Sequence, residues 1–430
     1  MSTSRLAFQA CYVHDQDRRS GADAVIIDCM SEKKVPTALE TADRLIGSDA
    51  SKDRFGSDRH LLLPMFAAAN GVGYLPLLTL PWLIGGLVRD WGLSDTVAGM
   101  IASCVIGLLA ATTLVVGTFV HRFSRRITSV LGACLALLGS AALTQFSRPS
   151  PMIALLATIA VGCGMCSAAG NSLLSSAKDP ARATARMWAL AVLWQTLVWF
   201  VTPLVVEKWN STGLYALWAV GCAIYLPLIM MMPDGTLEVR AGHQTAIRTP
   251  ALSLATIWSV VLCTFAFWLR DSLTWSLAER RGQLLGVSEY HLGLTFTAAS
   301  VLGLIGPIAA NHVGLRFGRV KTVLGGLLLI GVVLQVIASA TSPLPYQAGF
   351  LFWTCASIFS WTYIMEMAAA VDPKGRVAAT CGGIVFVTAA CGPVLGGAML
   401  DWGGSAILPT AILILTTVTL LAAYYSARRL

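Results

Sequence analysis

The sequence predicts an all-α membrane protein with twelve transmembrane helices in two pseudo-symmetric six-helix bundles. Three observations predict it: the composition, the spacing of the apolar runs and an internal repeat. Of the 430 residues, 56% are hydrophobic and only 12% are charged, which is about half the charged fraction of a soluble domain. Only helices and closed barrels satisfy the backbone inside a bilayer, and long apolar runs favour helices over alternating strands.

Twelve apolar runs, each near the roughly 20 residues that one crossing needs, fall into two sets of six. The first set covers 61–88, 95–120, 127–146, 151–176, 186–206 and 214–232, and the second covers 252–278, 290–313, 322–341, 346–370, 377–400 and 405–426. We therefore predict four regions: a polar cytoplasmic tail (1–58), a first bundle (59–232), a cytoplasmic loop between the bundles (233–250) and a second bundle (251–430).

Basic residues are concentrated in alternate loops, which predicts the orientation of the chain. Arg122, Arg125 and Arg126 follow the second run, and Arg316, Arg319 and Lys321 follow the eighth, whereas the intervening loops hold few. By the positive-inside rule both termini lie in the cytoplasm, so we expect a multi-pass protein of the cell inner (plasma) membrane. The net charge of +8 is dispersed over these loops and does not indicate binding to nucleic acid.

The two halves carry matching segments at a nearly constant separation. The segments are Arg122-Phe123-Ser124-Arg125 with Arg316-Phe317-Gly318-Arg319, Gly92-Leu93-Ser94 with Gly286-Val287-Ser288, and Asp179-Pro180 with Asp372-Pro373. The first two pairs are 194 positions apart (122 to 316, 92 to 286) and the third is 193 apart (179 to 372). Transporters use such repeated halves to alternate access around a site near the bilayer midplane.

The segment from Gly117 to Arg126 resembles the signature between helices two and three of the major facilitator superfamily, a Gly followed by Asp-Arg-x-Gly-Arg-Lys/Arg. His121 stands where that family has Asp, and Ser124 where it has Gly, which puts the family's latch salt bridge from that Asp in question. In the second half Leu315 takes the Asp position. The resemblance implies a gating motif made of Gly117, Arg122, Arg125, Arg126, Arg316, Gly318 and Arg319.

A second resemblance lies in the eleventh run, where Gly392-Pro393-Val394-Leu395-Gly396-Gly397 is similar to the family's Gly-Pro-x-x-Gly-Gly. Thr202-Pro203 is a faint counterpart in the fifth run. Such a segment lacks side chains and one backbone donor, so it permits close helix packing and bending. Together the two resemblances cover about residues 60–426 and imply a secondary transporter. For each motif a purely structural role is the favoured interpretation.

Charges inside a span cost about 2.5–3.5 kcal/mol on insertion scales and therefore mark functional positions. The repeat aligns Arg270 and Asp271 with Pro76 and Leu77, near the centre of the first run, so we predict that both lie near the midplane. Neighbouring helix positions point about 100° apart, so the two side chains need not pair. Bridging to neighbouring helices as structural links is the alternative interpretation.

A stripe at helical spacing, formed by Thr264, Trp268, Asp271, Trp275 and Glu279, suits a water-filled cavity. We expect Arg270 to be the counter-ion for a substrate carboxylate and Asp271, with Glu279, to carry the proton. Further candidates for substrate binding are Trp268, Trp275, Asn70, Tyr74, Asn171, Gln195 and Trp361, each of which could instead link helices.

Three other charged residues lie at or near the ends of the apolar runs. Glu366 is a candidate for proton coupling, although an ion pair with the arginines of the inner loop is the favoured alternative. Arg280 and Arg281 are expected to extend towards lipid headgroups.

Most of the eleven cysteines lie in apolar runs, and Cys163 and Cys166 stand among small residues, which favours helix packing over metal binding or a disulfide.

These observations predict a transporter and no enzyme, because the sequence has no phosphate-binding loop, dinucleotide fingerprint or metal-ligand cluster. We expect no cofactor and a monomer whose partners are the bilayer, protons and a small molecule. The leading hypothesis is proton-coupled symport of a small organic anion, with aromatic anions among the candidate substrates. The alternatives are a proton-coupled drug or metabolite efflux antiporter and a transporter-like receptor that moves no solute.

Overall fold

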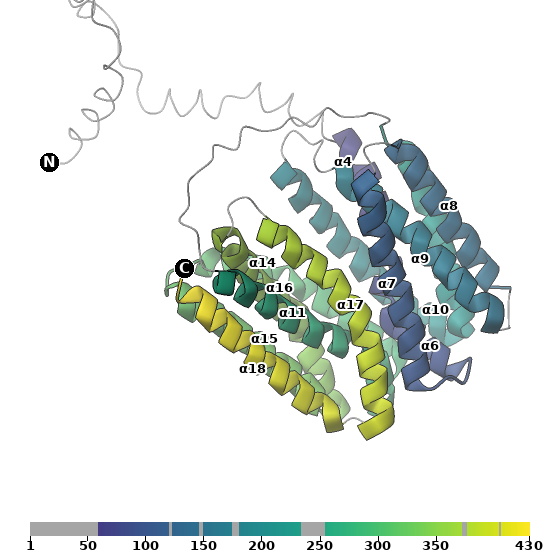
Figure 1. Cartoon of the computed structure of the whole chain (residues 1–430). Coiled ribbons are helices and arrows are strands. Elements are labelled where there is room, and N and C mark those ends of the chain that lie inside the picture. Colours follow the sequence, from purple (N-terminus) through teal and green to yellow (C-terminus); the bar gives the residue numbers. More distant parts are fainter. Residues whose placement is uncertain are drawn as a thin grey trace, which may run out of the picture. The chain divides into compact units, whose positions relative to one another are not determined.

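The computed structural model describes residues 59–119, 123–145, 149–173, 180–233, 254–371, 376–403 and 406–430. This part of the chain is helical, and it contains no strand (Figure 1). The predicted tail over 1–58 and nearly all of the predicted loop over 233–250 lie outside the described residues.

The helices of each half follow one another through short connections. The first half contains α4 (Arg59–Phe66), the π-helix η1 (Ala67–Val72), α5 (Leu75–Leu78), α6 (Leu80–Arg89), α7 (Asp95–Phe119), α8 (Arg125–Leu143), α9 (Pro149–Ser172) and α10 (Pro180–Met230). The second half contains α11 (Leu254–Ser276), α12 (Ala278–Leu284), α13 (Glu289–Gly303), α14 (Ile305–Val313), α15 (Arg319–Ser339), α16 (Pro343–Val371), α17 (Arg376–Gly403) and α18 (Ile407–Ala427).

Ten segments among the described residues are long and apolar enough to cross a membrane. One of them, Arg186–Met230, has 45 residues, which is about twice the length of one crossing, and its helical geometry is interrupted at Asn210, where φ is 53°. This segment therefore counts as two crossings. With the first apolar segment, which is broken into short helices, the total agrees with the twelve predicted.

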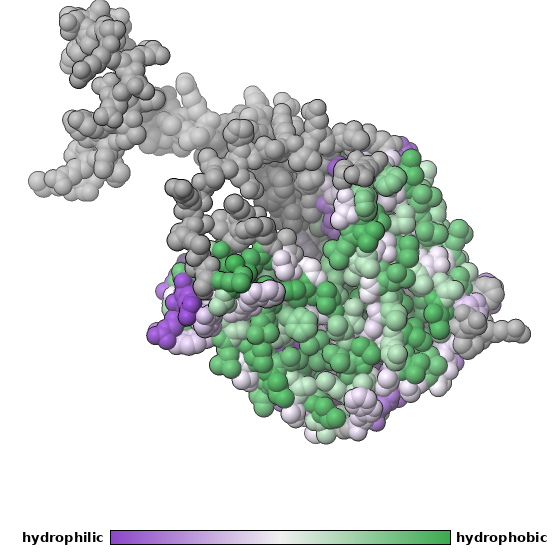
Figure 2. Space-filling model, in the orientation of Figure 1, coloured by the Kyte–Doolittle hydropathy of each residue, from purple (hydrophilic) through white to green (hydrophobic). Residues whose placement is uncertain are grey.

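The surface of the described helices is that of a multi-pass membrane protein. Figure 2 shows apolar side chains covering the sides of the helices and polar ones near their ends. Large apolar side chains such as Leu114, Leu138 and Leu413 are more than half exposed. Exposure on this scale is costly in water but favourable against lipid acyl chains.

Prolines divide the first apolar segment, which the sequence analysis treated as one run over 61–88. Pro76 and Pro81 each lie within the first two residues of a new short helix, because proline lacks the N–H that continues the hydrogen-bond ladder. The π-helical turn η1 lies between Pro64 and Pro76. Discontinuous helices of this kind expose backbone groups at the middle of transporters.

The repeat predicted from the sequence recurs in the helix boundaries. α7 and α13 begin at Asp95 and Glu289, α8 and α15 at Arg125 and Arg319, and α9 and α16 at Pro149 and Pro343, each pair 194 positions apart. The turns before α7 and α13 match as well, because both Gly92 (φ 64°) and Gly286 (φ 79°) adopt the left-handed conformation that favours glycine.

The two halves meet at a pair of glycine–proline contacts. Gly99 of α7 lies against Pro393 of α17, so that an added Cβ would be 2.2 Å from the proline carbonyl oxygen. Gly293 of α13, 194 positions after Gly99, lies against Pro203 of α10, where an added Cβ would be 2.1 Å from the ring. Since neither glycine has a side chain, the helix backbones approach more closely there than other residues allow.

The Gly-Pro-x-x-Gly-Gly segment of α17 packs against helices of both halves. Gly392 and Gly396 lie against Ser272 and Leu277, in and just after α11, whereas Gly397 lies against the Asp95 carbonyl of α7. Close packing, as predicted for this segment, is what the structure shows. The small residues of α9 act similarly, because Gly162 lies against the Gly132 carbonyl of α8.

α7 and α17 are close at one end and separate towards the other (Figure 1). Near the end that the basic residues predict to be outer, the contacts of Gly99 and Gly397 leave no space. Further along, an added Cβ at Gly107 would be 3.7 Å from Ala390, and at Gly117, Gly382 and Gly383 no described atom would lie within 4 Å. The halves therefore approach each other at the predicted outer end.

The glycine contact between the halves leads to a stability prediction. Gly99→Ala should lower the melting temperature of the purified protein in detergent, because the methyl group meets a backbone atom and overpacking costs about 1–3 kcal/mol. Gly383→Ala is the matched control in a helix with open space, and it should be neutral or slightly stabilising. Equal melting temperatures for the two variants would contradict the contact.

Candidate functional site

Arg270 of α11 is fully buried and contacts helices of its own half. Its Nη1 donates to Thr416 Oγ1 of α18 at 2.9 Å, and its guanidinium carbon lies 5.0 Å from the centre of the Phe267 ring. Gly331 of α15 leaves room for it, since a Cβ there would be 3.6 Å from Nη1. Nε and Nη2 have no hydrogen-bond partner among the described residues, so two buried donors of this cation are left unsatisfied.

Asp271, the next residue, faces a different helix. Its Oδ1 accepts from Trp353 Nε1 at 2.8 Å and from Ser357 Oγ at 3.0 Å, both on α16. The side chain is 6% exposed. The separation that helix geometry predicts for the two neighbouring charges is therefore present: the arginine contacts α18, and the aspartate contacts α16.

A cluster of aromatic rings from both halves lies on one side of Asp271. Trp275 of α11 stacks on Trp353 at a centroid distance of 5.3 Å and lies 5.0 Å from Trp199 of α10. Phe296 of α13 lies 5.3 Å from Trp275, and Trp82 of α6 lies 5.7 Å from Phe296. We call Trp82, Trp199, Trp275, Phe296 and Trp353 the aromatic cluster.

A second aromatic pair lies on the other side of Asp271 along the same two helices. Trp268 and Trp361 are 5.2 Å apart, edge to face, and both are partly exposed. Because Trp275 pairs with Trp353 and Trp268 pairs with Trp361, α11 and α16 run antiparallel with Asp271 and Ser357 between the two pairs. In general, tryptophan rings contact flat apolar groups, and a neighbouring carboxylate attracts a cationic group.

The broken first segment supplies backbone acceptors to this site. Pro81 has no N–H to give to the carbonyl of Leu77, and that carbonyl accepts from Trp275 Nε1 of the other half at 3.2 Å. The neighbouring carbonyl of Leu78 accepts from Trp199 Nε1 at 2.9 Å. Pro81 therefore leaves free the acceptor that anchors Trp275, and the next carbonyl along the chain anchors Trp199.

Charged residues join the halves at the predicted outer end. Arg89 of α6 contacts both Glu279 of α12, at 3.5 Å, and Glu289 of α13. Arg280 Nε donates to Asp95 Oδ1 of α7 at 2.9 Å. In addition, the Thr96 backbone N–H donates to Asp401 Oδ2 of α17 at 2.8 Å. Each of these contacts links one half to the other, so we call this set the outer ion cluster.

Glu279 is the buried member of the outer ion cluster. It is fully buried against the backbone of Gly85, where an added Cβ would be 1.8 Å from Oε2, and Oε2 has no described hydrogen-bond partner. Burial raises the pKa of Glu279 to about 8, the charge of Glu289 raises it further, and Arg89 and Arg280 oppose the rise. A carboxyl group of this pKa exchanges a proton near neutral pH.

The two arginines expected to reach lipid headgroups are held by the protein instead. Arg280 takes part in the outer ion cluster, and Arg281 is 4% exposed, with Nη2 donating to the Ala340 carbonyl at 3.2 Å. Ala340 is the residue at the end of α15, where carbonyl groups have no partner within the helix. The expectation for Arg281 was wrong because the end of that helix offers a better acceptor than the interface.

Glu366 of α16 forms an ion pair with Arg319 Nη2 at 2.8 Å, which is the arrangement favoured over proton coupling from the sequence. Gly318 begins α15 with a φ of 83°, and Arg316 is exposed. In the first half Arg125 is buried and Arg126 exposed, whereas Arg122 and His121 lie outside the described residues. The gating motif is thus described only in part.

The contacts of the remaining predicted site residues are with other groups than Asp271. Tyr74 faces Phe386 of α17 across the halves at 6.1 Å. Asn70 is 5% exposed in η1, and Asn171 donates to Ser167 of its own helix at 3.3 Å. Gln195 is partly exposed on α10, next to Thr196, which hydrogen-bonds Ser300 of α13 at 2.9 Å.

Sequence reasoning missed several residues that shape the site. Ser357, Trp353 and Trp199 contact Asp271 or its aromatic neighbours, and Arg89 and Glu289 surround Glu279. The sequence does contain a pattern that points to Trp353 and Ser357. Trp353, Ser357 and Trp361 follow one another at four-residue steps and so share a face of α16. No pattern in the sequence points to Trp199 or Arg89, since their partners belong to the other half.

Comparisons with known proteins agree with this architecture. No family model matches the sequence. The multidrug efflux pump Tap of Mycolicibacterium fortuitum is 25% identical over 382 residues, which cover 80% of this chain and 90% of that protein. A bacterial homologue of the human lysosomal transporter Spinster superposes with a TM-score of 0.65 at 13% identity, covering 86% of this chain and 97% of the other. The chain has the major facilitator fold.

Other solved structures of the major facilitator fold are equally similar. A D-xylose-proton symporter gives a TM-score of 0.64 at 14% identity, covering 85% of this chain and 96% of that one. A peptide transporter in complex with alafosfalin gives 0.65 at 15% identity, covering 86% and 95%. Likenesses of this kind establish the architecture that the sequence motifs implied.

The outer ion cluster leads to a prediction of pH dependence. The pKa of about 8 for buried Glu279, against its ordinary value of 4.5, means that the closed arrangement binds the proton more tightly than a hydrated, open one. Below about pH 4.5 Glu279 is protonated in both arrangements, and closure has no electrostatic cost. As the pH rises from about 4.5 to about 8, closure requires the open form to take up a proton, so its free-energy cost increases and reaches its full value above about pH 8. Acid should favour closure of the predicted outer end.

Spin labels at the exposed positions Val97 of α7 and Leu284 of α12 can measure this. In a variant without native cysteines, double electron–electron resonance should give a short distance at pH 6 and a longer, broader distribution at pH 9. With Glu279→Gln the distance should be short at both pH values. A distribution in the parent that does not change with pH would rule out Glu279 as the titrating group.

Proposed function

We propose that the protein is a proton-coupled secondary transporter of small amphipathic aromatic compounds, and that it exports them by exchange for protons. One observation carries this choice: the carboxylate of Asp271 accepts a hydrogen bond from Trp353 of the aromatic cluster, whereas the guanidinium of Arg270 lies against Phe267 and donates to Thr416. The name of the 25% identical relative, a multidrug efflux pump, supports the direction. Symport of an anion, the leading hypothesis from sequence, requires Arg270 to face the substrate.

A single carboxylate can couple two ligands by competition. Ionised Asp271 accepts hydrogen bonds from Trp353 and Ser357 and attracts a cationic or N–H group of a substrate, while the tryptophans contact its apolar part. Protonated Asp271 no longer attracts that group. Because the proton and the substrate exclude one another at this group, each passage of the substrate in one direction is linked to proton movement in the other.

The conformation of the described helices supports loading from the inner side. The outer ion cluster and the contacts of Gly99 and Gly293 bring the halves together at the predicted outer end. Towards the inner ends of α7 and α17 no described atom lies near Gly117 or Gly383. We propose that an exporter in this state accepts substrate from the cytoplasm, with both termini on that side and the chain acting as a monomer in the inner (plasma) membrane.

Anion symport is the second candidate, and one observation favours it. Arg270 keeps two buried donors without described partners, and a substrate carboxylate would satisfy both in a bidentate pair. This function requires the arginine to turn from Thr416 towards the aromatic cluster. A third candidate, a receptor that moves no solute, would show no transport in proteoliposomes.

The coupling role of Asp271 can be tested in proteoliposomes with a fluorescent aromatic cation. Asp271→Asn should lose accumulation driven by a pH gradient and should also weaken exchange of labelled for unlabelled substrate, because the amide neither carries the proton nor attracts the cationic group. Asp271→Glu is the matched control, and it should keep part of the gradient-driven accumulation. Accumulation at the parental rate in Asp271→Asn would refute the coupling role.

Arg270 distinguishes the two transport candidates. If the protein is a cation exporter, Arg270→Gln should leave the thermal shift caused by aromatic cations unchanged. If it is an anion symporter, aromatic carboxylates should stabilise the parent and lose that effect in Arg270→Gln by tenfold or more in apparent affinity. The unliganded melting temperature of each variant controls for folding.

A further inference from the structure

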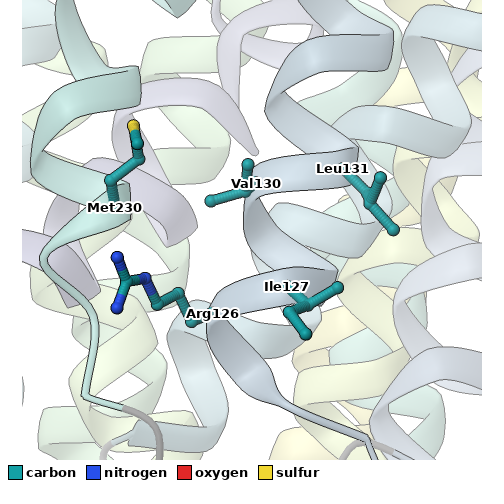
Figure 3. A pocket seen from close by; sticks show the side chains of 5 residues that line it. All are labelled: Arg126, Ile127, Val130, Leu131 and Met230. Atoms are coloured by element: carbon teal, nitrogen blue, oxygen red, sulfur yellow. The ribbon is translucent and has the colours of Figure 1, made fainter.

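A surface pocket of about 340 Å³ lies where α8 begins and α10 ends (Figure 3), and no member of the aromatic cluster lines it. Its lining consists of Arg126, Ile127, Val130, Leu131 and Met230. Ile127, Leu131 and Met230 are each about half exposed, so the pocket is open to the surroundings of the bundle. Because it lies at the ends of two membrane-spanning helices, it is at the depth of the lipid headgroups.

The polar end of this pocket attracts anions. Arg126 is exposed, and its side chain extends from α8 towards the end of α10 that carries Met230 (Figure 3). α8 begins one residue earlier, with Ser124 Oγ accepting from the Ile127 N–H at 3.2 Å. The partial positive charge of a helix amino terminus adds to that of the guanidinium. The other four lining side chains are apolar.

We propose that this pocket binds an anionic phospholipid, with the phosphate group at Arg126 and the first part of an acyl chain against the four apolar side chains. A free phosphate ion would use the charge but leave the apolar wall uncovered. A zwitterionic lipid would cover the wall but gain less from the charge. Basic pockets between transmembrane helices bind acidic headgroups in this way. The inference does not depend on the transported compound, because the pocket lies on the lipid-facing surface of the first half.

The internal repeat provides a charge-matched control. Lys321 is exposed in the first turn of α15, 194 positions after Ile127, so it occupies the corresponding helix start in the second half. Lys321→Gln removes one positive charge at the same depth. A lipid effect that depends only on net charge must therefore respond equally to Arg126→Gln and Lys321→Gln.

Native mass spectrometry of the purified full-length chain in detergent tests the proposal with three probes: phosphatidylglycerol, phosphatidylcholine and inorganic phosphate. Phosphatidylglycerol should bind the parent more tightly than phosphatidylcholine, and phosphate alone should produce no adduct and no thermal shift. Arg126→Gln should weaken phosphatidylglycerol binding about fivefold, the effect of one basic residue at an anionic surface. Lys321→Gln should leave it unchanged.

A second variant tests the apolar wall independently of the charge. Val130→Trp fills the pocket from α8 and should weaken both phospholipids, while Arg126 remains in place. Equal weakening by Arg126→Gln and Lys321→Gln would overturn the proposal in favour of a general surface charge effect. Unchanged binding in Val130→Trp, with a melting temperature like that of the parent, would overturn it as well, and a thermal shift from phosphate alone would assign the site to a soluble anion.

Discussion

The arrangement of the whole protein depends on how closely its two halves approach at Gly99 with Pro393 and at Gly293 with Pro203. Each contact places a glycine, which has no side chain, against a proline, which has no backbone N–H. The close approach therefore breaks no hydrogen bond on either side. The two contacts are related by the repeat in their glycines. The two halves are therefore joined at two places by contacts of the same kind.

The prolines that break the first segment have a second consequence at the midplane. In a bilayer a carbonyl that loses its helical donor must find another partner, because no water is available to it. Leu77 finds Trp275 of the opposite half. Breaking the helix therefore creates a link between the halves, and this link holds the ring that stacks on Trp353 beside Asp271. A continuous first helix would leave that indole N–H without this acceptor.

Periodicity and repetition predicted the architecture, because both are properties of the chain itself. The number of spans, the 194-residue offset and the packing role of Gly392 to Gly397 all follow from residue type and spacing. The breaks in the first segment were visible as Pro76 and Pro81 but were hidden by its high hydropathy. The partners of Glu279 were not predictable, since Arg89 lies 190 positions away and only the fold brings them together. For the same reason the burial of Arg281 against Ala340 could not be derived from local sequence.

Arg270 and Asp271 are neighbouring charges in one membrane-spanning helix, and the structure holds them in different ways. Both carry the cost of burial, but they are satisfied differently. Asp271 accepts two hydrogen bonds at one oxygen, from Trp353 and Ser357 of α16. Arg270 makes one hydrogen bond to Thr416 inside its own half. The two neighbouring charges are therefore held by different helices: the carboxylate by a ring of the aromatic cluster, and the guanidinium by a hydroxyl group of α18.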